Sequence, residues 1–485
     1  MRNKSGLMAL ACGTTLIFAA SVARADVTIS DEPTSNMSCT QGVCVPIASA
    51  AVLNVDDLRT LLAAGNVRVT TAGSSAQANN IDVTAKLGWS AHILTLDAFQ
   101  SLSVAAPITV KGKGKGKEGL AILINDGGTG GELGFFGKGH VIFQNLSSSL
   151  SINGTSYMLE NSVASLAVAI RRSPAGAFAL STDIVAGYSS HSPIKTPLTG
   201  TFEGLGNKIS SATIQSKNYP LQEAIGFFAV VNVTGILRDV GLIDVKITVG
   251  SGPGTMGGLV GRNYGTVFRS YATGTIRGSG ASEGGLVGYN YGGLIYQCFA
   301  KVHVKTVNDQ NGKGSGGGLV GWNAGRIVES YATGDVNNLY GNSSDFGGLA
   351  GGSRGARAVI SDSYSTGSVT TGSGVAGGLV GYNQIAITSS YSIGMPDGQV
   401  GVTGGLIGDD VSPTGSLSST YWDTDTSGIA NLSQGAGTPA NDPGIAGLST
   451  VQLQTGLPAG FDPSVWAYDA GINGGLPYLI ANPPQ

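Results

Sequence analysis

One short motif, Gly-Gly-Leu, recurs six times in the second half of the chain, and this recurrence limits what the chain can fold into. The copies lie at 257–259, 284–286, 317–319, 347–349, 377–379 and 404–406. Their starting positions differ by 27, 33, 30, 30 and 27 residues. Self-similarity at a period near 30 is the signature of a repeat architecture, in which each unit packs on its neighbours. We therefore expect one continuous solenoid over these residues.

Each unit continues in a similar way after its leucine. An apolar residue and a glycine follow, and in four units an asparagine comes two residues after the glycine, as Asn263, Asn290, Asn323 and Asn383. Two or three short strands in about 30 residues predict one coil of a right-handed parallel β-helix, since parallel crossovers are right-handed. A β-propeller is the alternative, but each blade needs four strands, which a unit of this length barely supplies.

Stacked coils, spaced about 4.8 Å apart, place like residues in columns. We expect the repeat leucines to form an interior column: Leu259, Leu286, Leu319, Leu349, Leu379 and Leu406. A second column is expected from the aromatic residues that follow a Ser, Cys or Thr: Tyr271, Phe299, Tyr331, Tyr364, Tyr391 and Tyr421. The asparagines could form hydrogen bonds from coil to coil, as in stacked cross-β structures.

The first 25 residues have the pattern of a secretory signal peptide. Arg2 and Lys4 precede an apolar stretch over 6–22, and Ala23-Arg24-Ala25 offers a cleavage site, so the mature chain is expected to begin at Asp26. No later segment approaches ~18 uninterrupted apolar residues, so we expect no membrane span in the mature chain. The protein is expected to be secreted, extracellular or attached to the cell surface.

Composition favours short strands and excludes one class of partner. The chain has 78 glycines and only 12% charged residues, which suits many strands and turns better than amphipathic helices. The formal net charge is −3, so there is no basic field that would attract nucleic acid. Nucleic acid is therefore not expected as a partner.

Cysteine and histidine usage gives one expected disulfide and no metal site. Cys39 and Cys44 bracket a short loop that an oxidising compartment would allow them to close; two free thiols are the alternative. The histidines at 92, 140, 191 and 303 are scattered and match no zinc-ligand or catalytic-triad spacing. We expect no metal and no cofactor.

The repeats divide the chain into five segments. These are the signal peptide (1–25), an N-terminal segment with the two cysteines (26–50), a β-rich solenoid region (51–225), the repeats (226–410) and a C-terminal cap (411–485). Helices are predicted over 54–65, with Asn54 as N-cap, and over 161–172. Strand pieces are predicted over 66–71, 81–89, 92–99, 101–111, 120–125, 140–144, 150–159 and 177–184. Within the cap, Trp422, Trp466 and Tyr478 are expected to cover the last coil, because an open solenoid end exposes strand edges.

Two motifs with catalytic or metal-binding precedents fit poorly. Residues 280–284 satisfy G-x-S-x-G, but a repeat strand follows where a nucleophile elbow needs a helix. Residues 423–428 match the start of a calcium loop, but the twelfth position is Gln434 in place of a glutamate, which favours a simple capping turn at Asp423.

The repeats resemble the GLUG-motif family, named for Gly-Leu-apolar-Gly, seen here at 258–261, 285–288 and their counterparts. The flanks at 150–157, 421–423 and 476–479 are similar to the repeat-bearing parts of filamentous-haemagglutinin-type secreted adhesins. This resemblance implies an adhesin-like function. The Asn-Pro-Asn motifs of the secretion domain of such adhesins do not occur, so the resemblance does not extend to that export route.

A variable position between the glycine and the asparagine of each repeat gives the candidate binding residues. It holds Arg262, Tyr289, Trp322, Gly352, Tyr382 and Asp409 in turn. Variation beside a constant leucine indicates the outer face, so Tyr289, Trp322 and Tyr382 are predicted to form a partly aromatic strip that binds glycans or a host surface. The alternative is that these rings only shield one another and the backbone.

Two other functions remain open from the sequence. β-Helices also support polysaccharide-modifying enzymes, and the N-terminal half has carboxylates that could serve one: Asp82, Asp97, Asp126 and Glu132. The protein could also be purely structural, in an envelope or matrix. Because the repeats carry few charges and no catalytic set is recognisable, we expect a binding scaffold without enzymatic activity.

Overall fold

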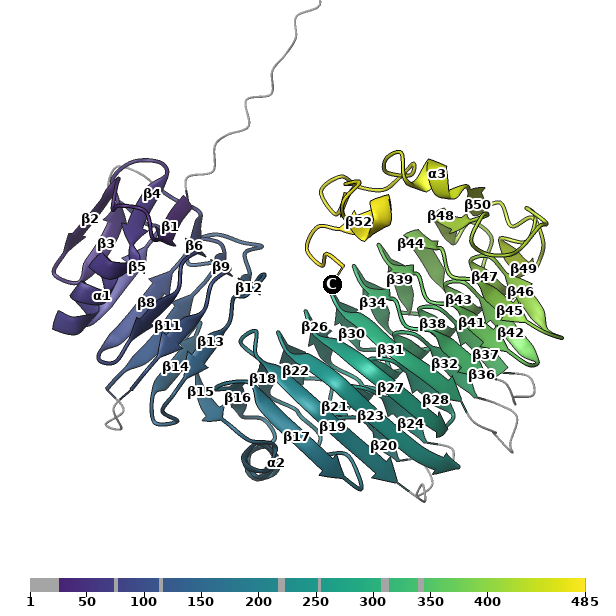
Figure 1. The fold of residues 1–485 in the computed structure, drawn as a ribbon, viewed down its shortest axis with the longest axis horizontal. Coiled ribbons are helices and arrows are strands. Elements are labelled where there is room, and N and C mark those ends of the chain that lie inside the picture. The colour runs from purple at the N-terminus through teal and green to yellow at the C-terminus, as the bar shows by residue number, and fades with distance from the viewer. Residues whose placement is uncertain are drawn as a thin grey trace, which may run out of the picture.

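The structure, a computed structural model, describes residues 26–73, 77–112, 117–216, 223–251, 254–306, 314–338 and 344–484. The predicted signal peptide, 1–25, therefore lies outside the described residues. Almost every described element is a β-strand, and the strands stack in parallel as a β-helix, which confirms the predicted fold class. Figure 1 shows two such stacks, here called the N-terminal arm (residues 26–160) and the repeat arm (161–448), which meet at a bend near α2 (Val163–Arg172).

The N-terminal arm has three strands per full coil. The first ladder runs in the order β4 (Ala51–Asn54), β1 (Asp26–Ser30), β6 (Asn80–Val83), β9 (Leu102–Val104) and β12 (Leu133–Phe135). The second is β7 (Leu87–Trp89), β10 (Ile108–Val110) and β13 (Val141–Phe143). The third is β3 (Val43–Pro46), β5 (Val67–Thr70), β8 (Ile93–Asp97), β11 (Gly119–Leu123) and β14 (Ser149–Ile152), with β2 (Met37–Thr40) pairing antiparallel to β3.

A helix takes the place of a strand at the start of the N-terminal arm. α1 (Val55–Ala64) connects β4 to β5 and contacts β7, the first strand of the second ladder. The side-chain oxygen of Asn54 accepts hydrogen bonds from the backbone N–H groups of Asp56 and Asp57, which is the predicted N-cap. The buried residues of α1, Val55, Leu58 and Leu62, belong to the core of the N-terminal arm. The helix therefore covers an otherwise open strand edge.

Several predicted strand pieces are divided where the chain turns a corner. The piece predicted over 81–89 is β6 and β7, and that over 101–111 is β9 and β10. The piece over 150–159 is an antiparallel hairpin of β14 and β15 (Thr155–Glu160), because Asn153 and Gly154 both have positive φ, 47° and 78°. The second helix, α2, begins two residues later than predicted, and its N-cap is Ser162.

The repeat arm has four short strands in a coil, more than the two or three predicted. The conclusion against a propeller still holds, because the strands of successive coils pair in parallel with one another. The first ladder is β20 (Ala224–Ile225), β24 (Thr255–Gly257), β28 (Ser282–Gly284), β32 (Ser315–Gly317), β37 (Ser344–Gly347), β42 (Gly374–Gly377) and β46 (Val402–Gly404). The second, which carries the candidate residues, is β21 (Phe228–Val231), β25 (Val260–Asn263), β29 (Val287–Asn290), β33 (Val320–Asn323), β38 (Ala350–Ser353), β43 (Val380–Asn383), β47 (Ile407–Asp410) and β49 (Ala436–Thr438).

The other two ladders complete each coil. One follows β16 (Ala177–Leu180) and contains β18 (Thr201–Glu203), β22 (Ile236–Arg238), β26 (Thr266–Phe268), β30 (Leu294–Tyr296), β34 (Arg326–Val328), β39 (Val359–Ser361), β44 (Ala386–Ser392) and β48 (Leu417–Asp423). The last contains β17 (Ile184–Ser189), β19 (Lys208–Ser216), β23 (Gly241–Ser251), β27 (Tyr271–Ser279) and β31 (Phe299–Thr306). It continues as the pairs β35 (Tyr331–Ala332) with β36 (Val336–Asn338) and β40 (Tyr364–Ser365) with β41 (Val369–Thr371), then β45 (Pro396–Gly398), while β50 (Ile445–Leu448) pairs with β48.

The interior of the repeat arm confirms the predicted leucine column. All six repeat leucines have 0% exposure: Leu259, Leu286, Leu319, Leu349, Leu379 and Leu406. They belong to a hydrophobic core that extends from Leu166 to Ala436. The N-terminal arm has its own core, which ends near Leu159 apart from Ala179 and Leu205. The change from one core to the other thus falls inside the segment predicted as 51–225.

The aromatic column lies outside this core and is covered by the C-terminal tail, here residues 449–484. Neighbouring rings from Tyr271 to Tyr391 stack with centroids 4.5 to 5.1 Å apart. Trp466, on β51 (Trp466–Ala467), packs against Tyr364 and Tyr391 at 6.0 and 5.9 Å. Residues 424–448 complete a last coil, so the predicted cap region both extends the solenoid and folds back along its side (Figure 1).

The tail is held by polar contacts as well as by aromatic packing. The Tyr391 hydroxyl donates to the Pro477 carbonyl oxygen at 2.7 Å, and Trp466 Nε1 donates to Asp362 at 3.1 Å. Near its end, Asn482 Nδ2 donates to the carbonyl oxygens of Cys298 and Glu329 at 3.1 and 3.2 Å. The tail contains α3 (Thr450–Leu453) and pairs β51 with β52 (Tyr478–Leu479).

Within the described residues, no helix is long and apolar enough to cross a membrane.

Candidate functional site

The structure places the three candidate aromatic residues in one column on the outer face of the repeat arm. Tyr289, Trp322 and Tyr382 occupy the third position of β29, β33 and β43. The strand register pairs Tyr289 with Trp322 directly, and Gly352 lies between Trp322 and Tyr382. All three rings are half-buried, whereas the residues beside them in each strand are buried. We call these three residues the aromatic strip.

Gly352 allows two rings of the strip to approach each other across a coil. The rings of Trp322 and Tyr382 have centroids 6.5 Å apart and planes within 21° of parallel. A Cβ atom at position 352 would lie 2.4 Å from Cζ3 of Trp322, so the indole occupies the space that a side chain there would need. The absence of a side chain at Gly352 therefore makes the strip nearly continuous.

Two further aromatic residues, Tyr264 and Tyr291, lie beside the strip but do not occupy the variable repeat position that predicted it. Tyr291 lies with its ring 5.3 Å from that of Tyr289 and 5.2 Å from that of Tyr264. Tyr291 is 54% exposed. Both residues directly follow a repeat asparagine, so the recurring Asn-Tyr-Gly at 263–265 and 290–292 was the signal that could have identified them.

The backbone below the strip is fixed by the predicted asparagine ladder. Asn263 Nδ2 donates to Asn290 Oδ1, and Asn290 Nδ2 donates to Asn323 Oδ1, both at 2.9 Å. Asn383 Nδ2 donates to Asp410 Oδ1 at 3.0 Å. These asparagines are fully buried, where such hydrogen bonds satisfy groups that water cannot reach. These bonds join the coils that carry Tyr289 and Trp322, and they join the coil of Tyr382 to the next one.

The strip borders two surface hollows of different character. The first, here the arginine hollow, has a volume of about 670 Å³ and is lined by Tyr289, Tyr291, Trp322, Arg354 and Arg357 with small residues between them. The second, here the acidic hollow, has about 690 Å³. Its larger lining residues are Trp322, Tyr382, Arg354, Asp345 and Asp409. Burial and the nearby Asp409 carboxylate raise the pKa of Asp345 to about 6.

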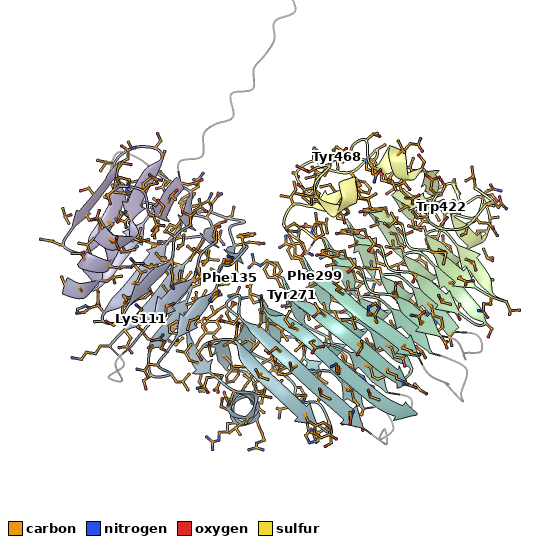
Figure 2. All side chains as sticks on the ribbon, viewed as in Figure 1. Lys111, Phe135, Tyr271, Phe299, Trp422 and Tyr468 are labelled. Carbon is orange, nitrogen blue, oxygen red and sulfur yellow. A yellow bond between two sulfur atoms is a disulfide. The ribbon has the colours of Figure 1, made fainter. Side chains whose placement is uncertain are left out.

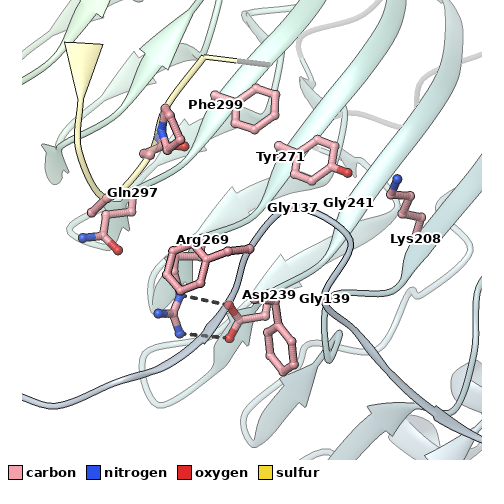
Figure 3. Close-up of a pocket in the computed structure, with 15 residues that line it drawn as sticks. Gly137, Gly139, Lys208, Asp239, Gly241, Arg269, Tyr271, Gln297 and Phe299 are labelled. Carbon is pink, nitrogen blue, oxygen red and sulfur yellow. Dashed lines mark hydrogen bonds and ion pairs between the residues drawn. The ribbon is translucent and has the colours of Figure 1, made fainter. Parts of the chain in front are cut away.

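A smaller pocket lies where the N-terminal arm, the repeat arm and the C-terminal tail meet (Figure 3). It has a volume of about 170 Å³, and its lining includes Phe135, Tyr271, Phe299 and Pro483. Figure 2 shows Tyr271 and Phe299 at this edge of the repeat arm, opposite Phe135. Charged side chains also line the pocket, among them Lys208, Asp239 and Arg269. The pocket is therefore the main alternative to the strip as a binding site.

The charged side chains at and beside this pocket pair with one another. Arg269 Nε lies 2.9 Å from Asp239 and Nη1 lies 3.0 Å from Glu132 of the N-terminal arm. Arg238 Nε donates to Glu203 at 2.5 Å. Burial, with Asp239 nearby, raises the pKa of Glu203 to about 7 in spite of Arg238. Of these contacts, the Arg269–Glu132 pair joins the two arms, whereas Glu203, with 0% exposure, pairs with Arg238 inside the repeat arm.

The four carboxylates considered for an enzyme are not gathered at one site, although two of them, Asp97 and Asp126, lie together. Both lie beside Arg68: its Nε donates to Asp97 at 2.9 Å, and its Nη2 lies 3.9 Å from a carboxylate oxygen of Asp126. Asp82 lies near Asp26, which together with burial raises its pKa. Glu132 pairs with Arg269 of the repeat arm. The acidic hollow beside the strip brings together a second pair, Asp345 and Asp409, which no sequence pattern joins.

The remaining predicted features have structural roles. Cys39 and Cys44 form a disulfide bond that joins β2 to β3, while Cys298 is buried as a thiol. Asp423 Oδ1 accepts from the backbone N–H groups of Asp425 and Thr426 at 2.8 and 3.2 Å, as in the favoured capping turn. In the part of the chain that the structure describes, no group of three or more His, Cys, Asp or Glu side chains could hold a metal ion.

One of the repeats matches a known protein family. Residues 252–277 match the family model described as the GLUG motif. The chain therefore contains a GLUG motif, and the repeats that share its Gly-Leu-apolar-Gly pattern form coils of the parallel β-helix. No curated protein sequence matches the chain. The chain is similar to a crystal structure of a protein from Bacteroides ovatus provisionally named an immunoglobulin A1 protease, with 19% identity, 67% of this chain and 92% of that chain covered, and a TM-score of 0.41.

Proposed function

We propose that the protein is an exported, adhesin-like binding scaffold that holds carbohydrate on its aromatic strip, at the cell surface or outside the cell. The observation that carries the proposal is the near-parallel arrangement of Trp322 and Tyr382 across Gly352, continued by Tyr289. Flat, partly exposed rings in a row suit the apolar faces of successive sugar rings. The buried asparagine bonds beside Tyr289 and Trp322 hold their strands in place, which lowers the ordering cost of binding.

Two features support an extracytoplasmic location. The N-terminal 25 residues have the signal-peptide pattern described above. The Cys39–Cys44 disulfide suits an oxidising compartment. Host or neighbouring cell surfaces, which display glycans, are the partners we propose.

The test compares a strip variant with a matched control. Wild type and the triple variant Tyr289→Ala, Trp322→Ala, Tyr382→Ala are applied to a glycan array and to a panel of immobilised polysaccharides. The control variant, Tyr188→Ala, Leu432→Ala, Tyr468→Ala, removes three exposed apolar side chains elsewhere. We expect binding by wild type and control and its loss in the strip variant, with all three folded by circular dichroism. Equal binding by the strip variant contradicts the proposal, and no binding by any protein favours a purely structural role.

A second candidate, a polysaccharide-modifying enzyme, is favoured by the acidic hollow. Asp345, whose pKa is raised to about 6, and Asp409 line this hollow beside Trp322 and Tyr382. A protonated and an ionised carboxyl are what acid–base cleavage of a glycosidic bond requires. We propose binding without turnover, so incubation with any bound polysaccharide should release no reducing ends. Release that Asp345→Asn abolishes would establish the enzyme instead.

A further inference from the structure

One coil of the repeat arm has an inserted loop beside the strip. In the preceding coil, two residues separate Asn323 from Arg326. The register pairs these positions with Ser353 and Val359, which five residues separate. The insertion therefore adds three residues at one corner of the solenoid. It leaves the flanking strands in register, so the stacking of coils does not require it.

The inserted loop brings two arginines to the rim of the arginine hollow. Arg354 and Arg357 are exposed, and both line the hollow with Tyr289, Tyr291 and Trp322. Among the described residues, neither arginine has a carboxylate within ion-pair distance, and no Asp or Glu lines this hollow. Burial and the nearby hydroxyls of Tyr291 and Tyr264 raise the pKa of the Tyr289 hydroxyl, in spite of the neighbouring Arg262 and Arg354. The hollow thus combines aromatic rings with guanidinium groups that are available to a ligand.

We propose that the arginine hollow selects an acidic saccharide, a sugar that carries a carboxylate or sulfate group. Its sugar ring packs on Trp322 and Tyr289, and its anionic group pairs with Arg354 and Arg357. Guanidinium groups bind such oxyanions through paired, charge-assisted hydrogen bonds, which lysines or neutral groups do not match. This inference rests on the function proposed above and adds the ligand class.

The acidic hollow on the other flank gives the ligand a direction. Asp345 and Asp409 lie beyond Trp322, on the side away from Tyr289. The lining of this hollow carries these two carboxylates and the guanidinium of Arg354, which borders both hollows, so an anionic group beside the carboxylates would meet a net negative charge, whereas a neutral residue of the saccharide would not. The acidic sugar therefore occupies the Tyr289 end of the strip, and neutral sugars extend toward Tyr382.

The test removes the two charges and keeps the rings. The variant Arg354→Gln, Arg357→Gln retains side chains of similar length, and the control Arg171→Gln, Arg172→Gln removes two exposed charges from α2. Binding is measured to immobilised polygalacturonate, dextran sulfate and neutral dextran at two salt concentrations. We expect wild type and control to prefer an acidic polymer, and the Arg354/Arg357 variant to bind it about tenfold more weakly or worse. The preferred polymer shows whether carboxylate or sulfate is the recognised group.

The outcomes separate this inference from the proposed function. If wild type binds neutral dextran as well as the acidic polymers, or if the Arg354/Arg357 variant binds like wild type, the acidic ligand class is wrong while the strip can still be correct. If the Arg354/Arg357 variant and its control lose binding equally, the effect is one of net charge, which also contradicts the inference. If wild type and the strip variant bind no saccharide, the proposed function itself is wrong.

Discussion

Asn323 and Ser353 occupy equivalent positions in neighbouring coils, and the hydrogen-bond ladder is interrupted between them. Asn323 Oδ1 accepts from Asn290 at 2.9 Å. On the other side, neither Asn323 Nδ2 nor the Ser353 hydroxyl has a hydrogen-bond partner among the described residues, although both side chains are fully buried. A serine is too short to reach either neighbour in a column that asparagines otherwise fill.

The interruption predicts a stabilising substitution. Ser353→Asn should join Asn323 to Asn383 and raise the free energy of unfolding by about 1 kcal/mol, because Asn323 Nδ2 gains an acceptor and an unpaired buried hydroxyl is removed. The opposite change, Asn290→Ser, should lower it by about 1–3 kcal/mol. Urea unfolding monitored by circular dichroism measures both. A destabilised Ser353→Asn, or a neutral Asn290→Ser, would show that the ladder contributes little.

The leucine column predicts a large loss of stability from one charge. Leu319→Asp places a carboxylate among coils where the side chain has 0% exposure, so we expect a loss of at least about 3 kcal/mol. Asn337→Asp adds the same group to the same coil at a half-buried, outward position paired with Lys305, and should change stability little. Thermal melts of the two variants decide the matter. Similar melting temperatures of the two variants would show that Leu319 does not lie in the interior.

The C-terminal tail predicts a protease-sensitive variant. Trp466 has 0% exposure between the tail and the aromatic column, so Trp466→Ala should weaken docking of the tail by about 3 kcal/mol or more. Limited proteolysis should then cut within residues 449–484 many times faster and leave the coils intact. Tyr468→Ala, at a 40% exposed position of the same tail, is the control. Equal digestion of Trp466→Ala and wild type would contradict the docking described here.

The junction cluster predicts a pH dependence of stability. Because burial raises the pKa of Glu203 to about 7 from its ordinary value of 4.5, the folded protein holds a proton that the unfolded chain releases between these values. Stability should therefore fall as the pH rises from 4.5 to 7 and level off above that, with a decrease in Tm of roughly several degrees. Glu203→Gln cannot titrate and should flatten this part of the profile. A wild-type Tm that rises over the same interval would show that Arg238 dominates instead.

The sequence predicted the regular part of the fold well because its signals repeat. Six copies of one motif define the period, so the leucine column and the asparagine ladder follow from stacking alone. The number of strands per coil did not follow, since β24 and β26 have only three residues each and leave no hydrophobic period that could be counted. The path of the tail also depends on long-range contacts, such as that between Tyr391 and Pro477, which no local pattern encodes.

The candidate site was only partly visible in the sequence. Tyr289, Trp322 and Tyr382 share one position in the repeat, and that position identified them. Arg354 and Arg357 lie in a loop that departs from the repeat, so a search for recurring positions passes over them. The acidic pair of Asp345 and Asp409 comes from two different strand ladders, β37 and β47, and only the stacked coils bring it together. The similarity to filamentous haemagglutinins remains a prediction.

The most direct test of the central claim uses the tryptophans of the chain as probes. Of the four, Trp89 is 5% exposed, Trp422 and Trp466 are 0% exposed, and Trp322 alone is half-buried. Titration with a saccharide that the protein binds should shift the tryptophan emission and protect it from acrylamide quenching, because a sugar on the strip covers the indole of Trp322. Trp322→Phe keeps an aromatic ring and should retain binding while losing both changes. Saturable binding that leaves the wild-type emission and quenching unchanged, or changes that persist in Trp322→Phe, would contradict the account.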